Sequence, residues 1–111
     1  MPGKLELKKA KNGQFHFNLK ASNGEVILSS EMYTTKRAAN NGIASVQKNS
    51  GDSSRFDRRT SKSKKPYFVL KAGNHQVIGQ SEMYESDRAM ANGIKSVMKS
   101  GPGAKVVDLT A

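Results

Sequence analysis

The chain has 111 residues, a formal net charge of +10 and no cysteine. This length suits one compact domain with a shared core, and the absence of cysteine excludes disulfides, thiolate metal sites and thiol nucleophiles. No stretch approaches the roughly 18 apolar residues of a membrane-spanning helix, and the charged start of the chain is unlike a signal peptide. We therefore expect a soluble, unexported, cytoplasmic protein whose positive charge favours anionic partners.

The sequence repeats itself at an offset of 51 residues without a gap. Roughly 19 of the 36 positions between 15 and 50 are identical to their partners, and the Ser-Glu-Met-Tyr run begins at both Ser30 and Ser81. The same offset relates Leu5, Phe56 and Val107, so one short strand recurs at the start, middle and end. We expect a single domain over residues 1–111, made of repeats at about 4–54 and 55–105 with a terminal strand at 105–110.

Each repeat has the pattern of strands followed by a helix. Apolar side chains alternate with polar ones from 15 to 21, which is typical of a strand with one buried face. Asn23 and Gly24 then predict a two-residue hairpin turn before a return strand at 26–29. Thr35 is the expected N-cap of a helix whose apolar positions fall near one face, and Ser86 is its counterpart in the second repeat.

Gly42 and Gly93 occupy equivalent places inside the two expected helices. A glycine in a helix costs on the order of 1 kcal/mol against alanine, and the sequence accepts that cost twice. One interpretation is that the missing Cβ lets each helix sit close to the sheet or to its twin helix. The alternative is simple inheritance from a recent duplication, and identity between the repeats does not separate the two.

A basic, serine-rich segment between residues 55 and 71 is the sharpest local signal. It predicts a hairpin that could bind phosphates by releasing counterions, with a tyrosine available to stack on a base and Lys20 nearby on the sheet. Val69 is expected on the outer face of the same strand. The alternative is a solvated loop on an ordinary surface. The candidate polyanion-binding residues are Arg58, Arg59, Lys62, Lys64, Lys65, Tyr67 and Lys71.

Glu31 and Glu82 recur at matching positions, so a twofold axis could bring two carboxylates together as in an acid–base pair. A structural role is the favoured interpretation: a glutamate just before a helix often accepts backbone N–H groups or pairs with an arginine such as Arg37 or Arg88. We do not assign these glutamates a catalytic role.

The remaining candidate side chains point to structure rather than chemistry. His16 and His75 stand at non-equivalent places without metal-ligand spacing, and no phosphate loop, nucleophile elbow or metalloprotease motif is present. We therefore expect no metal, no cofactor and no enzymatic activity. The aromatic–methionine pairs that precede each helix are expected to close the edge of the core. These pairs are Met32 with Tyr33 and Met83 with Tyr84.

The run from Asn18 to Glu31, followed by Arg37-Ala and by Asn41-Gly-Ile-Ala-Ser-Val, closely resembles the YegP-like family of small bacterial proteins. The second copy resembles it equally, and the likeness covers nearly the whole chain. It implies three strands, a helix and a strand in each unit, with the units exchanging their terminal strands around a pseudo-twofold axis. It implies no catalytic residue, cofactor or substrate, because the family has no established activity.

These observations predict an α+β fold of tandem β-β-β-α repeats plus a C-terminal strand. The expected sheet is single and antiparallel, with about seven strands, two helices on one face and internal pseudo-twofold symmetry. We expect a monomer. Two functions stay open: a small non-enzymatic interaction or stress-related module, and a low-specificity binder of nucleic acid or another polyanion through the basic mid-chain segment. The partner would be nucleic acid or an acidic protein, and not a membrane.

Overall fold

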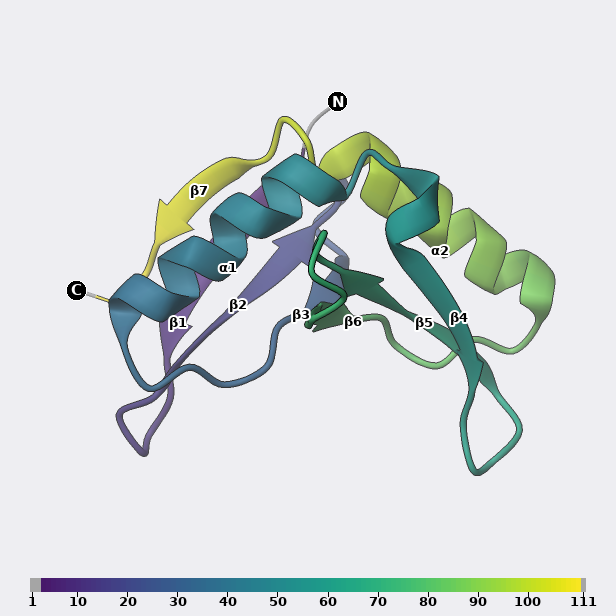
Figure 1. The fold of residues 1–111 in the computed structure, drawn as a ribbon, viewed down its shortest axis with the longest axis horizontal. Coiled ribbons are helices and arrows are strands. Elements are labelled where there is room, and N and C mark those ends of the chain that lie inside the picture. The colour runs from purple at the N-terminus through teal and green to yellow at the C-terminus, as the bar shows by residue number, and fades with distance from the viewer. Residues whose placement is uncertain (1–2, 111) are drawn as a thin grey trace.

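A computed structural model describes residues 3–110, so residues 1, 2 and 111 of the predicted domain lie outside the described residues. It shows one seven-stranded sheet in the order β4-β5-β6-β3-β2-β1-β7, with both helices against the same face (Figure 1). The elements in chain order are β1 Lys4–Lys9, β2 Phe15–Lys20, β3 Val26–Ser29, α1 Lys36–Asn49, the short 3-10 helix η1 Ser53–Arg55, β4 Phe56–Thr60, β5 Pro66–Lys71, β6 Val77–Gln80, α2 Asp87–Ser100 and β7 Lys105–Asp108.

The predicted α+β fold and the exchange of terminal strands are confirmed. β4 follows α1 but pairs with β5, and β7 follows α2 but crosses to the other edge of the sheet beside β1. At the centre, β3 and β6 join the two halves through the pair formed by Ser29 and Gln80. The halves bend away from this junction, so the two long hairpins point the same way in Figure 1.

One strand pair departs from the expected antiparallel sheet: β7 runs parallel to β1, which makes the sheet mixed. The repeat explains the direction. β1 and β7 are both related to β4 by the 51-residue offset, so equivalent strands run the same way. Because β1 already occupies the place beside β2, β7 lies one position further out and is parallel to it.

The tight turns differ from the predicted two-residue type. Between β2 and β3, Ala21 N–H donates to Glu25 and Gly24 N–H donates to Ala21, so the loop has three residues and only Gly24 has positive φ, at 86°. This is a type I turn closed by a left-handed residue. Asn23 favours it because its side chain accepts from the Glu25 N–H at 3.0 Å, instead of adopting positive φ itself.

Both helices begin where the sequence predicts. Thr35 Oγ1 accepts a hydrogen bond from the Ala38 N–H, and Ser86 Oγ accepts one from the Ala89 N–H, both at 3.0 Å. Each bond satisfies one of the N–H groups that a helix leaves free at its first turn. These caps fix the point at which the chain leaves the sheet and starts across it.

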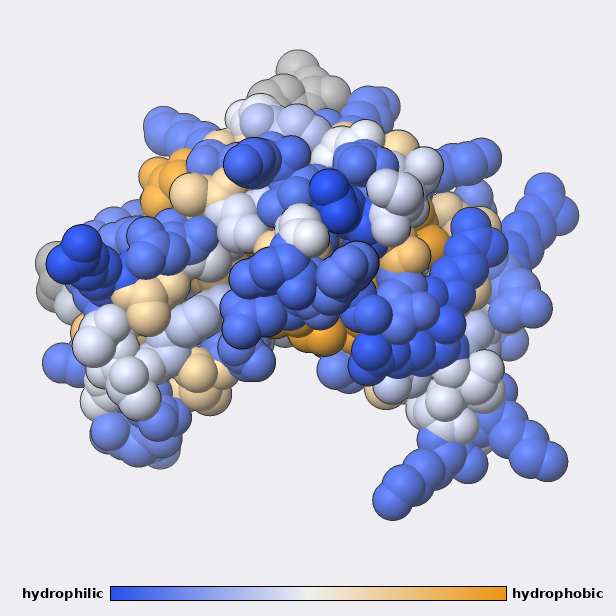
Figure 2. All heavy atoms as spheres, in the orientation of Figure 1, coloured by the Kyte–Doolittle hydropathy of each residue, from blue (hydrophilic) through white to orange (hydrophobic). Residues whose placement is uncertain are grey.

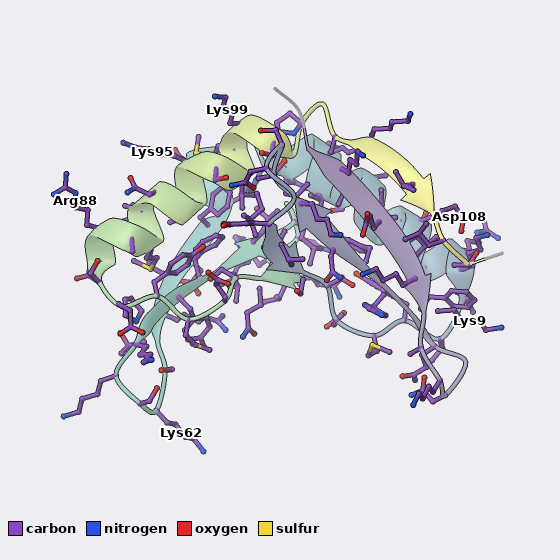
Figure 3. All side chains as sticks on the ribbon, turned by 180° about the vertical axis from the view of Figure 1, so that it is seen from behind. Lys9, Lys62, Arg88, Lys95, Lys99 and Asp108 are labelled. Carbon is purple, nitrogen blue, oxygen red and sulfur yellow. The ribbon has the colours of Figure 1, made fainter. Side chains whose placement is uncertain are left out.

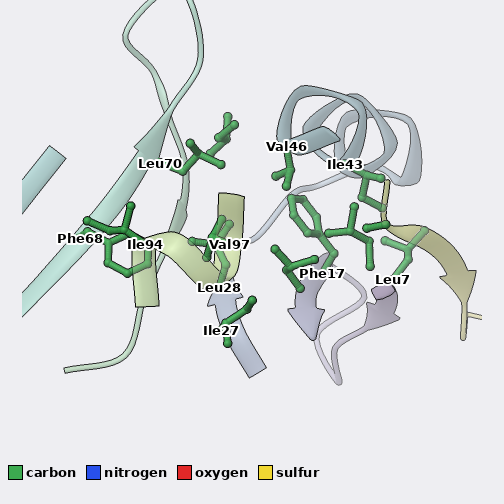
Figure 4. Close-up of a cluster of buried hydrophobic side chains, with 14 of the residues drawn as sticks. Leu7, Phe17, Ile27, Leu28, Ile43, Val46, Phe68, Leu70, Ile94 and Val97 are labelled. Carbon is green, nitrogen blue, oxygen red and sulfur yellow. The ribbon is translucent and has the colours of Figure 1, made fainter. Parts of the chain in front are cut away.

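The core lies between the sheet and the helices and is built mostly from equivalent residues of the two repeats (Figure 4). Phe17 stacks on Tyr33 at 6.1 Å between ring centroids, and Phe68 stacks on Tyr84 at 6.2 Å. The half-buried tyrosines close the core as predicted. The prediction for the methionines is wrong: Met32 and Met83 are more than 40% exposed.

Close packing explains the two helical glycines. A Cβ added to Gly42 would lie 2.5 Å from Tyr33 Oη, and one added to Gly93 would lie 2.6 Å from Tyr84 Cζ. Atoms that are not bonded do not approach this closely, so each glycine lets its helix lie directly on a tyrosine of its own repeat. The neighbour is therefore the aromatic cluster on the sheet and not the twin helix.

Candidate polyanion-binding surface

The basic mid-chain segment forms the hairpin of β4 and β5, as predicted. The strands pair from Phe56 with Leu70 to Thr60 with Pro66, and a turn over residues 61–65 joins them. Ser61 N–H donates to the Lys65 carbonyl and Lys64 N–H donates to Ser61, both at 2.9 Å. Figure 2 shows hydrophilic side chains projecting from the end of this hairpin, at lower right.

Three of the six predicted cations are held by carboxylates. Asp57 accepts a 3.0 Å hydrogen bond from Arg59 Nε and lies 3.5 Å from Lys71 Nζ, while Lys65 contacts Glu85 at 2.9 Å. The hydrogen bond from Arg59, with the charge of Lys71, holds the pKa of the Asp57 carboxyl below its usual value. These cations are partly neutralised, which leaves less charge for a ligand than the sequence suggests.

The strand geometry also divides the set between two faces. Arg59 pairs in register with Tyr67, and Asp57 with Val69, so these side chains share the sheet face opposite the helices. Arg58 lies on the other face, beside α2. Val69 is buried, contrary to the prediction of an exposed outer residue, because it lies in register between longer side chains on both neighbouring strands.

The prediction that Lys20 lies near the basic segment on the sheet is wrong. It lies on β2, which is separated from β5 by the two strands β6 and β3, and its Nζ is 2.9 Å from Glu6. The contact with Lys20 lowers the pKa of the Glu6 carboxyl. Lys20 and Lys71 therefore do not form a joint site on the sheet.

The end of the hairpin holds the free charge. Lys62 and Lys64 are exposed and have no carboxylate within ion-pair distance among residues 3–110. Lys64 has a φ of 66°, a left-handed conformation that the equivalent residue Gly13 adopts in the first repeat with a φ of 84°. A lysine in this conformation costs on the order of 1 kcal/mol, whereas a glycine adopts it freely. The second repeat thus tolerates backbone strain and presents a cation at this tip.

Three further cations on α2 were missed from the sequence. Arg88, Lys95 and Lys99 are exposed and project from the outer side of the helix, and Lys62 projects from the end of the hairpin (Figure 3). None of the three helical cations is ion-paired within the described part of the chain. Their spacing of seven and four residues places them along one side of a helix, and this periodicity could have identified them.

The other candidate side chains do not form a site. Antiparallel pairing of Ser29 with Gln80 sends Glu31 and Glu82 in opposite directions from the junction, and the two line different hollows. Neither glutamate forms the expected ion pair with an arginine within residues 3–110. His16 lies on β2 and His75 in the β5–β6 turn.

No group of three or more His, Cys, Asp or Glu residues between 3 and 110 is arranged to hold a metal ion. In the same residues, no helix has the length and apolar character needed to cross a membrane.

Comparisons with known proteins cover the whole chain. The model of a family described as a domain of unknown function, DUF1508, matches residues 10–57 and again residues 61–108, one match in each repeat. The UPF0339 protein YegP of Yersinia pestis is 62% identical over 108 residues, which are 97% of this chain and 96% of that protein. YegP of Escherichia coli K12 is 48% identical over 110 residues, or 99% of this chain and 100% of that protein.

Two solution NMR structures have the same fold. The UPF0339 protein SO3888 of Shewanella oneidensis superimposes with a TM-score of 0.92 at 56% identity, covering 99% of this chain and 93% of that one. The yegP protein of E. coli, titled a protein of unknown function, has a TM-score of 0.93 at 48% identity, covering 100% and 96%. The resemblance to the YegP-like family is confirmed, and these names specify no function.

Proposed function

The chain belongs to the DUF1508 family, and we propose that this member is a non-enzymatic module that binds nucleic acid with low sequence specificity. The proposed contact surface comprises five exposed cations of the second repeat. They are Lys62 and Lys64 at the hairpin end and Arg88, Lys95 and Lys99 on α2. We further propose that it acts as a monomer in the cytoplasm.

The observation that carries this proposal is the position of Lys64. The backbone there is left-handed, and the second repeat has a lysine where the first repeat has Gly13. Strained residues often mark functional positions, and here the strain coincides with a free positive charge at an exposed tip. Lys62 beside it and the helical cations supply further phosphate contacts.

The spacing of the helical cations fits a phosphate backbone. Arg88 and Lys99 are eleven residues apart, which corresponds to about 16 Å along a helix. Such a row contacts phosphates through charge alone and reads no base edges, so little sequence preference is expected. Tyr67 is half-buried and is not part of the proposed contact surface.

Fluorescence anisotropy with labelled 20-nucleotide single strands and 20-base-pair duplexes, at 50 and 200 mM KCl, tests the proposal. If four of these five cations contact phosphates, duplex affinity falls about 100-fold over this fourfold rise in salt. A variant with Lys62, Lys64, Arg88, Lys95 and Lys99 changed to glutamine should bind at least tenfold more weakly than the parent at 50 mM KCl.

The matched control removes five exposed cations from the first repeat by the same change to glutamine. They are Lys4, Lys9, Lys11, Arg37 and Lys48. Both variants lose the same net charge, so a general effect of charge would weaken both equally. Equal weakening, or no binding of the parent protein at 50 mM KCl, would contradict the proposal.

A further inference from the structure

β4 ends the sheet without the outer neighbour that its counterpart has. β1 and β4 are equivalent strands, because the 51-residue offset relates the pair of Leu5 with Leu19 to the pair of Phe56 with Leu70. On its other side β1 pairs with β7, whereas β4 has no second partner strand among residues 3–110. The repeat therefore defines a strand position that is filled at one edge of the sheet and open at the other.

The backbone of β4 is oriented to accept such a strand. At the filled edge, Leu109 N–H donates to the Leu7 carbonyl at 2.8 Å. Arg58 is the equivalent of Leu7. Along a strand, the backbone N–H and C=O groups of successive residues point alternately toward and away from the neighbouring strand. Ser61 N–H bonds to Lys65, so the N–H and C=O of Arg58, three residues earlier, point away from β5. The outer edge of β4 therefore presents the N–H donor and the C=O acceptor of Arg58 at the position where the equivalent strand, β1, bonds to β7.

A hollow of about 240 Å³ lies beside the open edge, lined by Arg58, Arg59, Thr60, Asp87 and Met90. α2 borders this hollow as α1 borders β7. At the filled edge Lys36 forms an ion pair with Asp108 at 2.6 Å, and Gln47 Nε2 donates to the Ala104 carbonyl at 2.9 Å. Asp87 is the equivalent of Lys36. The open site is therefore bordered by the equivalent strand and helix, but by different side chains.

We propose that the open edge of β4 binds an acidic, extended segment of a partner protein, which adds as a parallel strand. Edge strands bind peptides in this way because main-chain hydrogen bonds provide affinity and flanking side chains provide selection. Arg58, Lys62 and Lys64 are free of ion pairs within the described residues, which favours carboxylates. A second copy of this chain is disfavoured because each copy carries a net charge of +10.

The parallel direction predicts the order of residues in the segment. β4 runs toward the hairpin turn, so the segment ends beside Lys62 and Lys64. Its residue at the place of Asp108 lies beside both Arg58 and Asp87, where opposite charges favour a neutral side chain. The segment therefore starts with small and apolar residues and finishes with carboxylates.

The probe is a labelled peptide, Gly-Ala-Thr-Val-Val-Ser-Leu-Glu-Glu-Glu, which follows residues 103–109 with both charged residues made neutral. In anisotropy titrations it should bind at least tenfold more tightly than the same peptide with lysines for the glutamates. N-methylation of its leucine removes the donor equivalent to Leu109 and should weaken binding about tenfold. N-methylation of the serine, whose N–H points away from the edge, should weaken it less than threefold.

Equal affinity of the acidic and basic peptides, or equal effects of the two N-methyl groups, would overturn the inference. So would amide shift changes, in nitrogen-15 spectra, that centre on β1 and β7 instead of residues 56–60 and 87–91. On the protein side, Arg58→Glu should weaken the acidic peptide at least tenfold while Arg37→Glu leaves it within twofold. The same spectra show whether each variant is folded.

The proposed peptide site shares Lys62 and Lys64 with the proposed nucleic-acid surface, but different measurements test the two proposals. Its decisive comparison is between two N-methyl positions of one peptide, which have the same charge, so a general attraction for anions does not reproduce it. Failure of the DNA titrations leaves the peptide result unchanged, and failure of the peptide leaves the salt-dependent DNA result unchanged.

Discussion

Leu7 on β1 is 1% exposed, and its strand is flanked by β2 and β7; the equivalent residue on β4, Arg58, is exposed and has a neighbouring strand on one side only. The same 51-residue offset relates Gly13 to Lys64 and Lys36 to Asp87. The two repeats therefore build matching cores and present different outer edges. Position in the sheet, and not the repeat itself, therefore decides whether a residue is buried in the core or exposed at an edge.

The largest expected effect compares the two equivalent strand positions directly. Leu7→Ala should lower the free energy of unfolding by about 2–5 kcal/mol, because a buried leucine leaves a cavity. Arg58→Ala should change it by less than about 0.5 kcal/mol, as is usual for an exposed side chain. Urea unfolding at one pH measures both, and similar losses would show that β4 is as well covered as β1.

A smaller effect is expected at the helical glycines. Gly93→Ala should destabilise the protein by about 1–3 kcal/mol through overpacking against Tyr84, although alanine normally stabilises a helix. Tyr84→Phe removes the nearest oxygen and should restore part of the loss in the double variant. Gly42→Ala should show the same sign in the first repeat. A rise in melting temperature for either single variant is the contrary result.

The smallest effect concerns the turns between the second and third strand of each repeat. His75 has a φ of 69° where the first repeat has Gly24 with a φ of 86°. His75→Gly should raise the free energy of unfolding by about 0.5–1 kcal/mol, since glycine adopts this conformation without strain. The reciprocal Gly24→His should lower it by a similar amount. If both substitutions change the free energy of unfolding in the same direction, positive φ does not explain the difference between the two turns.

Local patterns predicted much of the fold. The repeat offset, the strand alternation before Asn23 and the caps at Thr35 and Ser86 are all confirmed, because each depends on residues close in sequence. The turn type was wrong because an Asn-Gly pair also fits a three-residue loop, in which the asparagine side chain accepts a bond from Glu25.

The site was less predictable because its charges depend on distant residues. Lys65 is paired with Glu85, twenty residues away in sequence, and this pairing exists only once β5 and the start of α2 are placed. The open edge of β4 likewise follows from where β7 goes. The stripe that begins at Arg88 is the exception, since helical spacing alone would have identified it.

We propose that the second repeat, and not the first, carries the nucleic-acid contact. Titration of the nitrogen-15-labelled protein with a 20-nucleotide single strand at 50 mM KCl tests it most directly, because every amide reports its own position. We expect shift changes at residues 61–65 and along residues 87–99, with little change at the equivalent residues 10–14 and 36–48. Equal changes at equivalent positions of both repeats would contradict it.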